Sequence, residues 1–147
     1  MHSPVRWILL LSLAGIGACS RETTGTLVTV ADARDAPARL ADSGAPGDSV
    51  GDILAFDQPL LDASGRRIGD NSGVCVRTRV GHSYQCQWTL SLADGSIQVA
   101  GREFDRGESA IAIVGGTGAW SGVRGEMTSV NNGDGTFTQT LRYRLPR

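Results

Sequence analysis

Few side chains of this sequence can carry covalent or metal chemistry. All 14 basic residues are arginine, so the chain has no lysine to form a Schiff base or to bind phosphate in a Walker-type loop. His2 and His82 are too few for a multi-histidine metal site. His82 follows the expected Val80-Gly81 turn, where an exposed histidine is a better interpretation than a member of a Ser-His-Asp triad. The sequence therefore predicts no metal ion and no cofactor.

The spacing of Cys75 and Cys86 predicts a disulfide bond. An antiparallel hairpin that turns at Val80-Gly81 places the two cysteines directly opposite one another. Directly opposed β-carbons lie close enough for a disulfide, and closing so short a loop stabilises the fold by about 2–3 kcal/mol. Two free buried thiols are the alternative interpretation.

A second group of candidates consists of polar and aromatic side chains that strand alternation places on an inner face. In the last strand the inner row runs from Phe137 to Leu145, and in the strand from Tyr84 it includes Cys86. The hairpin then turns Cys75 inward too. The expected ligand-binding side chains on these inner rows are Phe56, Arg77, Trp88, Phe137, Gln139 and Tyr143.

Asp32 and Gln58 are the candidates for catalysis, because each ends an apolar row with a polar group. In the first strand the expected inner row is Val28, Val30 and Asp32. If these polar groups serve a ligand, they should converge near one mouth of the interior. Simple filling of a small barrel is the alternative interpretation of the whole inner set.

Short strands must position these residues, because no segment has an apolar stripe of helical spacing. Turn signals such as Asp94-Gly95 and Asp134-Gly135 separate the runs, and residues 36–49 read as a loop broken by proline and glycine. The eight expected strands are 26–32, 50–60, 67–78, 84–92, 97–104, 109–115, 123–130 and 136–145. This pattern is typical of an all-β barrel or sandwich.

Size and charge restrict the organisation and the partners. With 147 residues the chain forms one domain, and a formal net charge of -1 provides no basic surface for nucleic acid. Neighbouring opposite charges such as Arg102-Glu103 indicate a solvated surface. A homo-oligomer is a further candidate state.

The N-terminus has the features of an export signal. Arg6 precedes an apolar stretch over residues 7–18 that is too short to span a bilayer. The sequence Ile16-Gly17-Ala18-Cys19 resembles a bacterial lipobox, so we expect a signal peptide at 1–18, acylation of Cys19, a lipid-anchored tether at 19–25 and the folded domain at 26–147. Ser20 favours the outer membrane, facing the periplasm. An ordinary secretory peptide with an incidental cysteine is the alternative.

Two segments carry a family resemblance. Residues 50–56, with Arg67-Ile68-Gly69 and 73–76, resemble the corresponding stretch of allene oxide cyclases, and residues 112–125 resemble the glycine motif of dirigent proteins. The resemblance to this superfamily implies an eight-stranded antiparallel β-barrel with a hydrophobic lumen. Plant members bind a reactive lipid epoxide or phenoxy radicals and direct ring closure or coupling, and some bacterial relatives cyclise polyketides.

The same resemblance places the family's inner-wall polar groups at Asp32, Gln58 and Cys75. Val30 stands where plant cyclases have a glutamate, which argues against allene oxide as the substrate. A disulfide at Cys75 would remove the free thiol of a plant-type lumen.

Two functions from different classes remain. The first is a barrel that binds a hydrophobic, reactive small molecule and steers its cyclisation or coupling by shape and desolvation, as an isomerase or cyclase if it is an enzyme. The second is a non-catalytic envelope lipoprotein whose barrel binds a ligand or is a structural module. Export favours the second, and the family resemblance favours the first.

Overall fold

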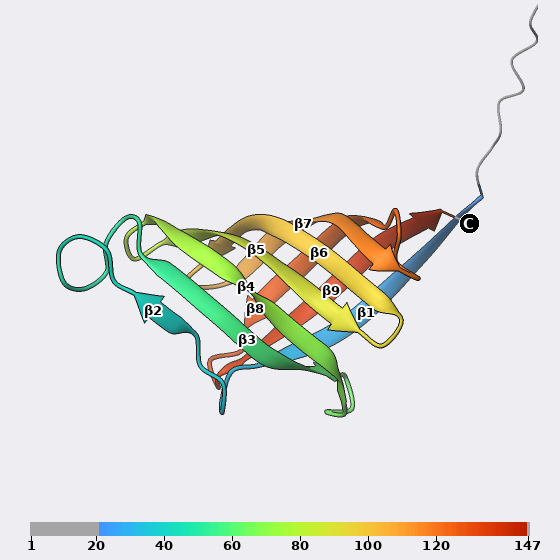
Figure 1. Ribbon diagram of the computed structural model, residues 1–147, viewed down its shortest axis with the longest axis horizontal. Helices are drawn as coiled ribbons and strands as arrows, with labels where there is room; N and C mark the ends of the chain where they lie inside the picture. The colour runs from blue at the N-terminus through green and yellow to red at the C-terminus, as the bar shows by residue number, and fades with distance from the viewer. Residues whose placement is uncertain (1–20, 147) are drawn as a thin grey trace, which may run out of the picture.

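Strands account for all the regular structure in residues 21–146, the part of the chain that the computed structural model describes (Figure 1). These residues include no helix long and apolar enough to cross a membrane. The strands are β1 Glu22–Asp32, β2 Arg39–Ala41, β3 Ile53–Asp62, β4 Arg67–Arg79, β5 Ser83–Leu92, β6 Gly95–Phe104, β7 Glu108–Gly118, β8 Arg124–Asn131 and β9 Thr136–Pro146.

The eight long strands close into an antiparallel barrel, which confirms the expected fold. Consecutive strands from β3 to β9 pair with one another, β9 pairs with β1, and β1 pairs with β3. The closing contact is short and runs from Thr29↔Asp62 to Ala31↔Leu60. Full closure leaves most of the strands without a free edge.

The short strand β2 lies within the segment that the sequence predicts as a loop. Because β1 pairs with only the last part of β3, the first part of β3 has a free edge, and β2 covers it through Arg39↔Ala55 and Ala41↔Ile53. The start of β3 also differs from the expected Val50, because Gly51 adopts a turn with φ of 99°. Only glycine takes that conformation readily.

The beginning of β1 and the end of β9 lie together at the right of Figure 1, away from the projecting β2–β3 loop. Residues 22–25, which the sequence analysis assigns to the tether, belong to β1 and pair with residues 143–146 of β9. The barrel therefore begins at Glu22 rather than at Thr26.

Alternation predicts the inner faces of β3, β5 and β9 correctly. Phe56, Trp88 and Leu141 point inward from these strands, as expected. Apart from Ala31 and Cys86, the apolar side chains with at most 4% of their surface exposed fill one half of the barrel: Leu60, Leu90, Ile97, Val99, Ile111, Ile113, Val123, Met127 and Leu141.

The expected inner row of β1 is wrong. Residues directly opposite in an antiparallel pair share a face, and the inward Gln139 and Leu141 of β9 stand opposite Thr29 and Leu27. The inner row is therefore Leu27, Thr29 and Ala31, whereas Val28 and Val30 point outward, and Val28 is 38% exposed.

Candidate functional site

The half of the barrel interior that the core does not fill is a cavity of about 620 Å³. Its lining comes from the end of β1, the start of β3, the β4–β5 hairpin, the end of β6 and the β8–β9 turn, so it opens at one end of the barrel. A cavity of this size suits a small organic molecule. Six of the eight residues expected to bind a ligand or to act in catalysis line it: Phe56, Gln58, Arg77, Trp88, Phe137 and Gln139.

Asp32 does not line this cavity, contrary to the expected convergence with Gln58. It follows the inward Ala31 on β1 and forms an ion pair with Arg34, with Nη2 to Oδ2 at 2.6 Å and Nε to Oδ1 at 2.8 Å. These hydrogen bonds lower the pKa of Asp32 to about 2. A carboxylate that is ionised and already paired outside the cavity is poorly suited to exchange protons with a ligand inside it.

Tyr143 points into the barrel but lies at its other end. Its ring packs edge-on against Trp120, with ring centroids 5.2 Å apart. The facing Gly25 has no side chain, and a Cβ there would be 2.5 Å from the Tyr143 ring. Tyr143 therefore helps to close the packed end and does not line the cavity.

Aromatic rings form much of the cavity wall. Phe56 and Trp88 meet edge to face with ring centroids 6.3 Å apart, and Tyr84, Phe104 and Phe137 are the other aromatic residues of the lining. Gly73, opposite Trp88 on β4, makes room for it, because a Cβ at Gly73 would be 2.3 Å from the Trp88 Cβ. These rings give the cavity flat, apolar surfaces against which a ligand can pack.

Amide side chains form the floor, next to the apolar core. Gln139 accepts a hydrogen bond from Thr29 Oγ1 at 3.1 Å and donates through Nε2 to Asn71 Oδ1 at 3.3 Å. Asn71 lies on β4, which is not adjacent to β9, so this bond crosses the interior. Gln58, also buried, makes no side-chain hydrogen bond to any described residue that would hold it in this network.

Arg77 stands at the mouth with its charge already balanced. Its Nε lies 2.6 Å from Asp48 in the β2–β3 loop, and its Nη1 donates to Asp105 at 2.6 Å. Its guanidinium also stacks on Tyr84, 3.6 Å from the ring centroid. Burial opposes the charge, but the hydrogen bond to Asp105 and the nearby carboxylates hold the pKa of Arg77 above its usual value. Arg77 therefore fastens the β2–β3 loop to the mouth.

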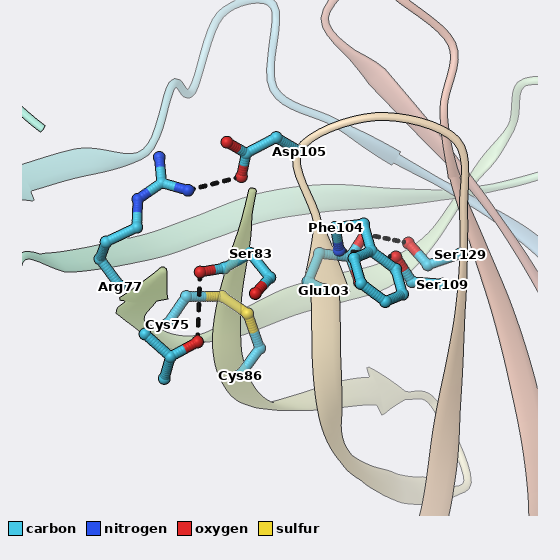
Figure 2. The surroundings of a disulfide bond; sticks show 10 residues. Cys75, Arg77, Ser83, Cys86, Glu103, Phe104, Asp105, Ser109 and Ser129 are labelled. Carbon is cyan, nitrogen blue, oxygen red and sulfur yellow. Dashed lines mark hydrogen bonds and ion pairs between the residues drawn. A yellow bond between two sulfur atoms is a disulfide. The ribbon is translucent and has the colours of Figure 1, made fainter. Parts of the chain in front are cut away.

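Cys75 and Cys86 form the predicted disulfide, and Cys75 lines the cavity. The interpretation as two free thiols is wrong. The observed register pairs Cys75 with Cys86 and Arg77 with Tyr84, which turns Cys75 and Arg77 inward as expected. Figure 2 shows the bond beside the Arg77–Asp105 pair.

Sequence reasoning missed Glu103, whose neighbour Arg102 suggested a solvated surface. Glu103 follows Val99 and Gly101 on the inner row of β6 and lines the cavity. Ser129 Oγ donates to its Oε1 at 2.8 Å, whereas Oε2 is buried and has no hydrogen-bond partner. Desolvation raises the pKa of Glu103 to about 7, although the Ser129 hydrogen bond acts in the opposite direction. The alternation of β6 was the signal that could have identified it.

Trp88 Nε1 is a second buried polar atom without a partner. A buried donor or acceptor left unpaired costs about 1–3 kcal/mol. Both unpaired atoms belong to side chains that line the cavity, so each is a candidate partner for a polar group of a bound molecule.

A comparison with family models matches residues 28–141 to the allene oxide cyclase barrel-like domain. The chain belongs to this family. As an allene oxide cyclase-like barrel, it resembles several solved structures over nearly their whole length.

One similar structure is a pyocyanin demethylase, 28% identical, with a TM-score of 0.67, and the match covers 82% of this chain and 99% of that one. A pterocarpan synthase dirigent protein is 18% identical, with a TM-score of 0.64 and coverage of 86% and 96%. An exo-specific intermolecular Diels-Alderase is 14% identical, with a TM-score of 0.67 and coverage of 84% and 98%. The same fold therefore occurs in proteins that are named for several different activities.

Proposed function

We propose that this barrel binds a hydrophobic, reactive small molecule in its cavity and steers the cyclisation or coupling of that molecule. The observation that carries the proposal is the cavity of about 620 Å³, lined by aromatic rings and by two side chains with unpaired polar atoms. Apolar walls with a few polar groups are the usual composition of a small-molecule site.

The expected mechanism relies on shape and exclusion of water. The cysteine that lines the cavity is held in a disulfide, and the chain contains no lysine, so the wall offers neither a free thiol nor a lysine amine as a nucleophile. A rigid apolar cavity can still hold a flexible molecule in the conformation that closes a ring. If the protein is an enzyme, it is an isomerase or cyclase.

Two of the similar proteins support this class of activity, because their names describe a dirigent protein and a Diels-Alderase. A third is named as a demethylase of pyocyanin, which is a different reaction. A heme-binding cyclase of similar fold catalyses a [4 + 2] cycloaddition. The substrate of the present barrel is inferred from its own cavity and is not transferred from these proteins.

The test is recovery of the natural ligand from protein produced in its own host. Leu54, which lines the cavity, is changed to Trp to fill it, and the exposed Val76 of β4 is changed to Trp as a matched control. We expect mass spectrometry of solvent extracts to find the same small molecule with wild type and Val76→Trp but not with Leu54→Trp. Equal recovery from both variants would contradict binding in the cavity.

A second function, a non-catalytic envelope lipoprotein that carries a ligand, is favoured by the lipobox-like Ile16–Cys19. This segment lies outside the described residues. We propose that Cys19 is acylated and anchors the barrel in the outer membrane on the periplasmic side. A palmitate analogue should label wild type but not Cys19→Ser, and recovery of an unlabelled, soluble wild type would contradict the anchor.

Incubation of the extracted molecule with the purified protein distinguishes a carrier from an enzyme. Recovery of the molecule unchanged favours a carrier, whereas its conversion to a product favours an enzyme.

A further inference from the structure

Glu103 is an acidic side chain of the cavity that forms no ion pair with any cation among residues 21–146. Of the described residues that line the cavity, Arg77 is the sole cation, and it is already paired with Asp48 and Asp105. The carboxyl of Glu103 instead has one neutral partner, the hydroxyl of Ser129. The negative charge of Glu103 is therefore available to a ligand.

The groups around Glu103 come from every neighbouring strand. Tyr84 of β5 stands opposite Glu103 and carries the stacked Arg77. On β7, Ser109 accepts a hydrogen bond from the backbone N–H of Phe104 at 2.9 Å, and on β8 Ser129 donates to Glu103. Figure 2 shows Glu103 and Ser129 on neighbouring parts of the wall near the disulfide. None of these contacts provides Glu103 Oε2 with a donor.

We propose that Glu103 binds an acidic O–H or N–H of a conjugated ligand and takes up its proton. This inference rests on the proposed function, because it requires a molecule in the cavity. The unpaired oxygen, the aromatic walls and the lack of a free cation all favour a ligand with a flat ring system and a polarised donor.

The proton balance is simple. The O–H or N–H bond of the ligand breaks, its electron pair stays on the ligand heteroatom, and the proton binds the Glu103 carboxylate. The ligand gains the electron density that drives ring closure or rearrangement, and the neutral carboxylic acid returns the proton to the product. No oxidant or reductant is consumed. A carboxyl with a pKa of about 7 accepts and releases a proton readily at neutral pH.

Ser129 acts as a positioning residue. Its hydroxyl holds Oε1, which leaves Oε2 as the oxygen that meets the ligand. Ser129→Ala should therefore weaken binding of a donor ligand less than Glu103→Gln does, and it should raise the pH at which binding changes, because the Ser129 hydrogen bond lowers the pKa of Glu103.

The experiment uses two probes of nearly equal shape, 2-naphthol, which has an O–H, and 2-methoxynaphthalene, which has none. Each is titrated by fluorescence into wild type, Glu103→Gln and the control Glu126→Gln, a change at an exposed glutamate of β8. We expect Glu103→Gln to bind 2-naphthol about tenfold more weakly, the size of effect expected for a lost charge-assisted hydrogen bond. Binding of 2-methoxynaphthalene should be unchanged in all three proteins.

Emission provides a second readout. Excited 2-naphthol is a far stronger acid than 2-naphthol in its ground state, so emission from naphtholate reports transfer of its proton to a nearby base. We expect this emission in wild type and Glu126→Gln but not in Glu103→Gln. If Glu103→Gln does not fold, the pH profile of wild type decides: affinity for 2-naphthol should rise through about pH 7 as Glu103 ionises, while affinity for the methoxy probe stays flat.

The outcomes separate the two proposals. Binding of both probes with equal affinity to wild type and Glu103→Gln, with naphtholate emission in both, would overturn the role of Glu103 and leave the cavity as a ligand site. A flat pH profile for 2-naphthol would overturn it as well. Failure of both probes to bind wild type would instead contradict the proposed function itself.

Discussion

Burial of the Glu103 carboxyl makes the stability of the barrel depend on pH. Desolvation raises its pKa from the usual 4.5 to about 7, so between these values the folded protein holds a proton that the unfolded chain has released. The contribution of protonated Glu103 to the free energy of unfolding is fully present below about pH 4.5. It is lost as the pH rises through about 7, and the loss is at most about 3 kcal/mol.

Glu103→Gln, which stays neutral, should remove this dependence. We expect urea unfolding at pH 8 to give a higher free energy of unfolding for Glu103→Gln than for wild type, and nearly equal values at pH 5. The exposed Glu126→Gln serves as the control and should follow wild type. A parallel pH dependence in wild type and Glu103→Gln would show that the carboxyl is solvated in the folded protein.

The two glutamines of the floor should respond differently to replacement by leucine. Gln139→Leu leaves the buried Thr29 and Asn71 without their partner, which should lower the free energy of unfolding by about 2 kcal/mol. Gln58→Leu removes no side-chain hydrogen bond to a described residue and should leave stability unchanged or raised. Thermal and urea unfolding of both variants check this, and equal losses would place Gln58 in the structural network.

Sequence alternation shows which way a side chain points but not where it lies along the barrel axis. It correctly predicted that Tyr143 points inward, but the cavity lies at the opposite end of the barrel, where β9 begins. Glu103 was missed because the exposed Arg102 beside it suggested a solvated surface, although the alternation of β6 places Glu103 on the inner row. The direction of Asp32 follows only from the pairing of β1 with β9, which turns the preceding Ala31 inward.

For a single strand, the inner face can be predicted from the sequence only when one face is apolar and the other is polar. In β5 and β9, apolar and polar residues alternate, and the inner rows were predicted correctly. In β1, Leu27 and Val28 are adjacent and equally apolar, so local pattern does not choose between them. The pairing of β1 with β9, which are far apart in the sequence, determines that Leu27 points inward and Val28 outward.

The hairpin of β4 and β5 is held by its disulfide, which closes a loop between residues 11 apart in the sequence. Reduction should lower the free energy of unfolding by about 2–3 kcal/mol, because the unfolded chain gains freedom. Unfolding with and without reductant measures this, and a Cys75→Ala, Cys86→Ala double variant should not respond to reductant. Alkylation of both thiols in unreduced, delipidated wild type would contradict the bond.

The barrel as a whole is packed at one end and hollow at the other. β1 begins at the packed end, near Trp120 and Tyr143, and the cavity opens where β1 finishes. The proposed acyl group on Cys19 would thus attach close to the packed end, only three residues before Glu22. The mouth would then open away from the membrane.

This arrangement predicts that anchoring does not restrict access to the cavity. Acylated protein in phospholipid vesicles and soluble Cys19→Ser protein should bind 2-methoxynaphthalene with the same affinity once partitioning of the probe into lipid is subtracted. Much weaker binding by the anchored form would indicate that the mouth faces the bilayer.

Both proposals together place a flat organic molecule against Glu103 in the hollow end of the barrel. A crystal structure of the protein with 2-naphthol would show this placement in a single measurement. We predict the naphthalene ring between Phe56 and Phe137 inside the cavity, with its oxygen within hydrogen-bond distance of the Glu103 carboxyl. Density for the probe on the outer face alone, with the cavity filled by water, would contradict this account.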